Sequence, residues 1–130
     1  MRSRDNIKKR NRIKKEAEDY FKAWFRKSFQ KGVKDARALL GDDVVAIVGI
    51  EFLTFVEQSI LDDEYSKQVV TYTRKKAVEK NFAILKTNME LILGQKIDQY
   101  YIDFSVENNT TCMTLLLGEE VQNDEKSKTL

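Results

Sequence analysis

The side chains best spaced for chemistry in this sequence are three consecutive acids, Asp62, Asp63 and Glu64. Carboxylate oxygens are the ligands that hard cations such as Mg²⁺ prefer, and Asp42 and Asp43 would join them if the fold brought the two groups together. Acids at a turn or a helix start already stabilise the helix by interacting with its dipole. We therefore predict no metal site and assign these acids to a helix start.

The residue types needed for most catalytic sites are missing. The 130 residues contain no histidine, which removes the commonest general base and metal ligand, and Cys112 is the only cysteine. The five glycines are single and widely spaced, so the chain has no phosphate-binding loop or dinucleotide fingerprint. We predict that Cys112 is a small buried hydrophobic residue and that Asp103, a lone carboxylate, is solvated. The protein is therefore predicted to be no enzyme and to need no cofactor.

Positive charge is concentrated at the start of the chain, although the formal net charge is only +2. Eight basic residues in the first fifteen stand against one acid, Asp5: Arg2, Arg4, Lys8, Lys9, Arg10, Arg12, Lys14 and Lys15. This basic segment, residues 1–15, could contact an anionic membrane surface or nucleic-acid phosphates, or it could be a solvated helix extension. No apolar run approaches the roughly 18 residues that span a bilayer. We expect a cytoplasmic chain, with peripheral contact at the inner face of the cell membrane as an option.

A helix with a large apolar side follows the basic segment. Its apolar residues recur three and four positions apart: Ile13, Ala17, Tyr20, Phe21, Trp24, Phe25 and Phe29. We predict that Gly32 stops this helix in a left-handed conformation. The aromatic stripe is predicted to be core, or a homodimer interface if the core cannot absorb all the rings.

Two strands are predicted next, over residues 34–40 and 44–50, joined by the turn residues 41–43. The second strand is apolar on both faces, so we expect it inside the sheet with both faces covered. Gly49 indicates a bulge or the close approach of a helix.

Alternation ends at Thr54, where Thr54 and Glu57 form the Thr-x-x-Glu pattern of a helix capping box. The short helix that follows has an apolar side that we expect to pack inward: Phe55, Val56, Ile60 and Leu61. Asp62 or Asp63 is predicted to cap the next helix.

That next helix is long and carries two apolar stripes. The first is Tyr65, Val69 and Tyr72, and the second is Val78, Phe82, Leu85, Met89 and Ile92. The slip in spacing between them indicates a bend or two layers contacted in turn. Gly94 is predicted to close the helix.

The chain ends in a second hairpin. Tyr100, Ile102, Phe104 and Val106 alternate with polar residues, and Met113, Leu115 and Leu117 follow on one side of the returning strand. We predict an α+β domain over residues 16–118, with an antiparallel sheet of about four strands covered by helices on one face, and a polar tail over 119–130.

The order of these signals between about Phe29 and Leu117 resembles the MpsC family, the YbcI-like proteins of a Na⁺-translocating, membrane-potential-generating system of some bacteria. The stretches that carry the resemblance are "FQKGV", "DDVVAIVGIEFLTFVEQSIL", "VVTYTRKKAVEKNFAILKTNMELILGQKI" and "YYIDFSVENNT". The family-motif positions are Leu53, Thr54, Glu57, Arg74 and Asp103. Both prolines of the family's usual motifs are missing here.

The resemblance implies a soluble, non-enzymatic accessory or regulatory subunit of such a system, which includes systems for inorganic-carbon uptake. Its expected partners are membrane transport proteins, with contact to anionic lipid through the basic segment. The alternative is a nucleic-acid-binding adaptor that uses the same basic segment.

Overall fold

The computed structural model describes residues 4–121 and has seven elements, which confirm the predicted α+β class. In chain order they are α1 (Arg4–Phe29), β1 (Asp35–Leu40), β2 (Val44–Ile50), α2 (Phe55–Ser59), α3 (Glu64–Leu93), β3 (Gln95–Ser105) and β4 (Thr110–Glu120). Arg2 of the basic segment and residues 122–130 of the predicted tail lie outside the described residues. Strand β4 continues past Gly118, where we predicted the tail to begin.

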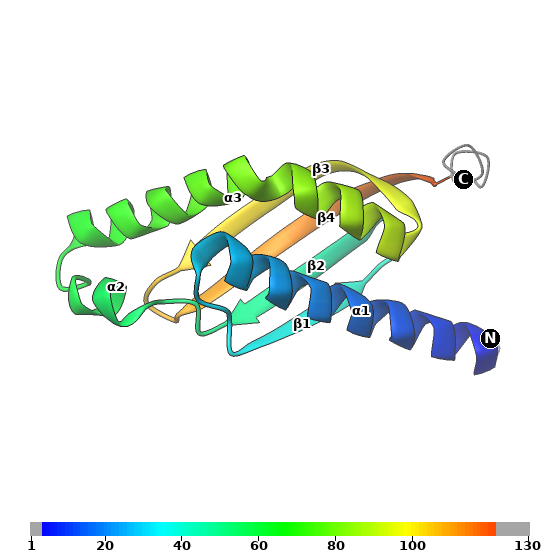
Figure 1. The fold of residues 1–130 in the computed structure, drawn as a ribbon, viewed down its shortest axis with the longest axis horizontal. Helices are drawn as coiled ribbons and strands as arrows, with labels where there is room; N and C mark the ends of the chain where they lie inside the picture. The colour runs from blue at the N-terminus through cyan, green and yellow to red at the C-terminus, as the bar shows by residue number, and fades with distance from the viewer. Residues whose placement is uncertain (1–3, 122–130) are drawn as a thin grey trace.

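The four strands form one antiparallel sheet in the order β1-β2-β4-β3, and α1 and α3 lie side by side on one face of it (Figure 1). Strand β2 is interior, as predicted. The prediction that both its faces are covered is wrong, because the helices lie on one face only. Val45, Ile47 and Gly49 are buried on that face, whereas Val44 on the other face is exposed.

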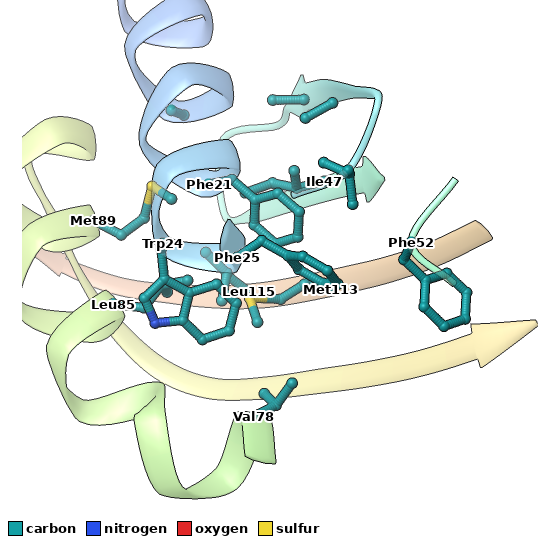
Figure 2. Close-up of a cluster of buried hydrophobic side chains, with 14 of the residues drawn as sticks. Phe21, Trp24, Phe25, Ile47, Phe52, Val78, Leu85, Met89, Met113 and Leu115 are labelled. Carbon is teal, nitrogen blue, oxygen red and sulfur yellow. The ribbon is translucent and has the colours of Figure 1, made fainter. Parts of the chain in front are cut away.

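The aromatic stripe of α1 forms the centre of the core, as predicted. Figure 2 shows Phe21, Trp24 and Phe25 pointing from α1 into the layer between α3 and the central strands. The Phe25 ring lies 5.8 Å from Phe21 and 4.5 Å from Phe29, measured between centroids. Trp24 Nε1 donates to the carbonyl of Asn81 at 3.0 Å, which anchors the indole to α3. Burying the aromatic area of this stripe holds α1 on the sheet.

Of the two apolar stripes predicted for α3, the second is largely buried and the first is exposed. Val78, Leu85 and Met89 of the second stripe are buried, and their line continues backward through Arg74 and Val70. The first stripe is exposed on another side of the helix. The change in spacing therefore marks a change from a solvent-facing to a core-facing stripe.

Helix ends and glycines follow the predictions with one exception. Asp63 caps α3, and Gly94 closes it with a φ of 73°. Helix α1 ends before Gln30, whose φ is 60°, so the prediction that Gly32 takes the left-handed conformation is wrong. Gly49 lies in a continuous register, and a Cβ there would sit 2.9 Å from Thr111 Cγ2 and 3.4 Å from Phe21 Cε2. Of the two predicted roles, it therefore has the close helix approach.

Candidate functional site

A largely buried ion pair joins α2 to α3. Arg74 Nη2 lies 2.5 Å from Glu57 Oε1, and Arg74 Nε donates to Glu57 Oε2 at 2.9 Å. Arg74 Nη2 also donates to the carbonyl of Phe52 at 3.0 Å. The Arg74 side chain is buried and that of Glu57 is 21% exposed. Two parallel bonds between guanidinium and carboxylate fix the orientation of both side chains.

Aromatic rings surround the guanidinium group. Its central carbon lies 4.4 Å from the ring centroid of Phe29, 5.2 Å from that of Phe52 and 5.8 Å from that of Phe25. Arg74 Nη1 is the one buried side-chain nitrogen or oxygen without a hydrogen-bond partner among the described residues. The aromatic rings give the guanidinium group favourable cation–π contacts. We call Arg74, Glu57, Thr54, Phe52 and Phe29 the Arg74 cluster.

The chain before α2 holds Glu57 in place. Thr54 Oγ1 accepts from the Glu57 amide at 3.1 Å, and Glu57 Oε1 accepts from the Thr54 amide at 2.8 Å, which confirms the predicted capping box. Asn109 Oδ1 accepts from the amides of Phe52 and Leu53 at 2.8 and 2.9 Å. Both carboxylate oxygens of Glu57 therefore already accept hydrogen bonds. The Arg74 cluster holds α2 against α3, and Asn109 ties the chain before α2 to the turn between β3 and β4.

The family-motif positions do not all meet. Leu53, Thr54, Glu57 and Arg74 come together, and the buried Leu53 accepts at its carbonyl from Lys31 Nζ at 2.8 Å. Asp103 lies apart: its side chain is 81% exposed and pairs with Lys75 Nζ at 3.3 Å. Asp103 therefore does not share a pocket with Glu57 and Arg74, as a catalytic site built from these three side chains would require.

The environment of Glu57 makes stability depend on pH. Burial by itself would raise the pKa of the Glu57 carboxyl, but hydrogen bonds from Arg74 and the Thr54 amide, with the Arg74 charge, lower the pKa below its ordinary value. A carboxyl whose pKa is lower in the folded state than in the unfolded state stabilises the fold. This stabilisation is complete above the unfolded-state pKa, about 4.3, and is lost as the pH falls through the folded-state pKa.

We therefore expect urea midpoints of the wild type to fall between pH 5 and pH 3, and to fall less in Glu57→Gln. The exposed Glu119 provides the control, since Glu119→Gln should keep the wild-type pH dependence. Equal pH dependence in Glu57→Gln and wild type would contradict the assignment.

The two acidic groups lie at opposite ends of the long helix. Asp63 Oδ1 accepts from the Ser66 amide at the start of α3, at 2.7 Å. The turn with Asp42 and Asp43 lies beside the end of α3, where Gln95 Nε2 donates to the Asp42 carbonyl at 3.3 Å. Within residues 4–121, no three His, Cys, Asp or Glu side chains are grouped as a metal site would require. Cys112 is half-buried rather than buried, because its side of β4 faces away from the helices.

The basic segment forms the first half of α1 from Arg4 onward, and Figure 1 shows its first turns extending beyond the end of β1. Arg4, Lys8, Arg12 and Lys15 are exposed and share one side of the helix through their spacing. Lys9 is also exposed.

Some of these cations have structural partners. Lys14 Nζ pairs with Glu18 at 2.7 Å, and Lys15 Nζ pairs with Asp19 at 3.4 Å. Arg10 is turned toward the sheet and donates to the carbonyl of Leu40 at the free edge of β1. On the same edge, the amide of Ala38 donates to Glu18 Oε2 at 2.8 Å. Arg10 and Glu18 thus shield an edge that would otherwise be open to another strand.

An exposed apolar surface lies at the other end of the molecule. Phe55 is 85% exposed, Val56 69%, Tyr65 76% and Tyr72 64%. Ile60 and Val69 are exposed as well. The prediction that α2 packs an apolar side inward is wrong for all but the half-buried Leu61. Helix α2 lies beyond the ends of the strands (Figure 1), whereas Tyr65, Val69 and Tyr72 lie on the side of α3 that faces away from the buried Val70 and Arg74.

Comparison with known proteins identifies one family. Residues 9–119 match the family described as "Na+-translocating membrane potential-generating system (MpsC)". No curated protein matches the chain, and no solved structure does. Among the described residues, no helix is long and apolar enough to cross a membrane.

Proposed function

The chain belongs to the MpsC family, and on this premise we propose that it is a non-enzymatic accessory subunit of a Na⁺-translocating, membrane-potential-generating system. It works at the cytoplasmic face of the membrane, where its domain surface docks onto a membrane transport protein. The basic side of α1 contacts anionic lipid and adds to that attachment.

The observation that carries the proposal is the exposed basic side of α1 in a chain of this family. Arg4, Lys8, Arg12 and Lys15 project from one side of a helix that extends beyond the sheet. Each basic residue close to an anionic membrane is worth about 1 kcal/mol. Several together give reversible, salt-sensitive attachment without a membrane-spanning helix.

The surroundings of α1 favour lipid over nucleic acid. A hollow of about 280 Å³ beside the basic segment is lined by Lys9 and Arg10 together with aliphatic residues: Ile13, Leu40, Val45, Leu93 and Leu117. Cations next to aliphatic side chains suit an amphiphile with an anionic headgroup. Single-stranded nucleic acid would be expected to meet aromatic side chains on which its bases stack.

Vesicle co-sedimentation tests the lipid contact. The wild type should bind vesicles of phosphatidylglycerol and phosphatidylcholine at low salt, and Lys8→Ala with Arg12→Ala should weaken binding about 30-fold, equivalent to ~2 kcal/mol. A matched variant that removes two exposed lysines of α3, Lys80→Ala with Lys86→Ala, should bind within a few-fold of wild type.

Equal losses in the two double variants would show that net charge, and not the basic side of α1, drives the binding. Binding to duplex DNA at low salt that is tighter than binding to the vesicles would instead support the nucleic-acid adaptor.

A further inference from the structure

We propose that the exposed apolar end of the molecule is a docking surface for a cationic, apolar segment on the cytoplasmic side of a membrane protein. This surface, the apolar end, consists of Phe55 and Val56 of α2, Ile60 at the C-cap of α2, and Tyr65, Val69 and Tyr72 of α3. The choice of a membrane protein as partner rests on the proposed function. The docking surface itself rests on the exposure, rigidity and charge of these residues.

The apolar end is unlike the scattered exposed hydrophobic residues of an ordinary surface. Tyr65, Val69 and Tyr72 follow one another at positions i, i+4 and i+7, so they form a stripe along one side of α3. Phe55 and Val56 lie at the same end of the molecule, on the helix immediately before α3 (Figure 1). Phenylalanine and tyrosine are enriched in the centres of protein interfaces.

The Arg74 cluster gives this surface a defined shape. Glu57 belongs to α2 and Arg74 to α3, so their bidentate pair fixes the two helices that carry the apolar end. On the other side, Lys67 of α3 pairs with Glu107, in the turn between β3 and β4, at 3.5 Å. A surface that is already ordered loses less conformational entropy when a partner binds. This gives the family-motif positions Thr54, Glu57 and Arg74 a common role in presenting the apolar end.

Charge selects the kind of partner. The stretch from Phe55 to Tyr72 contains four acidic residues and one lysine, a formal charge of −3. Glu57 is neutralised by Arg74, whereas Asp62, Asp63 and Glu64 form no ion pair within residues 4–121. An anionic lipid surface or a nucleic acid would be repelled here, and a lysine- or arginine-rich segment attracted. Cytoplasmic segments next to membrane spans carry an excess of these two residues.

The basic segment of a second copy is the competing cationic partner. The basic segment has few apolar side chains that could pack against the six exposed residues of the apolar end, since Ile7 and Ile13 are the only large apolar residues between Arg4 and Lys15. A segment that combines apolar and cationic residues matches the apolar end better. Self-association is therefore an outcome to be tested against the proposal.

Site-specific photo-cross-linking in the native cells tests the proposal. The variants are Phe55→benzoylphenylalanine and, as a control on the same helix α3, Ile84→benzoylphenylalanine; Ile84 is 60% exposed but lies outside the apolar end. Irradiation should join position 55, and not position 84, to an integral membrane protein through a peptide that contains apolar and basic residues. Adding Asp62→Asn and Glu64→Gln should lower the yield at position 55 about fivefold, the effect of two partly exposed ion pairs.

The proposal is overturned if position 55 cross-links to a second copy, to lipid or to a nucleic-acid-bound protein, or if it gives no product. Fractionation of the same cells separates the two proposals. A chain found in the membrane fraction without the cross-link contradicts the docking surface alone, whereas a chain absent from the membrane fraction contradicts the proposed function as well. Unchanged thermal unfolding of the position-55 variant would show that it remains folded.

Discussion

Replacing Arg74 by methionine should lower the free energy of unfolding by about 3–5 kcal/mol, the usual loss when one member of a buried ion pair is removed. The substitution leaves the partly buried Glu57 carboxylate without its cation and removes the donor to the Phe52 carbonyl. It also removes the charge that lies 4.4 Å from the Phe29 ring centroid. Urea unfolding at pH 7, followed by far-ultraviolet circular dichroism, measures the change.

The neighbouring Lys75 provides the control. Its pair with Asp103 likewise joins α3 to another element, strand β3, but the two side chains are 45% and 81% exposed. Lys75→Met should therefore change stability by less than about 1 kcal/mol. Arg74→Lys tests geometry, because lysine keeps the charge but cannot make the two parallel bonds. A loss for Arg74→Met as small as that for Lys75→Met would refute the structural role of the cluster.

Truncating Phe25 to alanine is expected to cost about 3–5 kcal/mol, because it removes a fully buried ring and leaves a cavity. Phe25 packs against Phe21, Trp24 and Phe29, so the loss extends along the whole aromatic stripe of α1. Chemical denaturation of the purified chain measures the effect.

Phe55→Ala is the control for Phe25→Ala, because the same side chain is removed from an exposed position. Phe55 is 85% exposed, and Phe55→Ala should change stability by no more than about 0.5 kcal/mol. A large destabilisation by Phe55→Ala would show that this ring packs within the folded chain and is not available to a partner. Similar effects at the two positions would contradict the assignment of one ring to the core and the other to a surface.

The two ends of the molecule carry different surfaces. The basic side of α1 lies at one end, and the apolar end made by α2 and α3 lies at the other (Figure 1). The Arg74 cluster uses its charges inside the fold, with both Glu57 oxygens engaged. In the function that we propose, the two ends bind partners and the Arg74 cluster holds the apolar end in place.

Features that depend on neighbouring residues could be predicted from the sequence. The capping box of Thr54 and Glu57, the cap at Asp63 and the left-handed Gly94 each involve groups only a few positions apart. Both hairpins were predicted because alternation and turn residues are local as well. The order of these signals also sufficed to identify the family, which the match over residues 9–119 confirms.

Features that depend on distant segments were decided by the tertiary structure. An apolar stripe such as Tyr65, Val69 and Tyr72 has the same pattern whether or not another element covers it. It is exposed because the other elements pack against the opposite side of α3, where Val70 and Arg74 are buried. Arg74 is buried because Glu57, 17 positions away, and Phe29 on another helix meet it in space. Periodicity shows that a helix has an apolar side, but burial is set by which elements pack against that side, and this requires the whole fold.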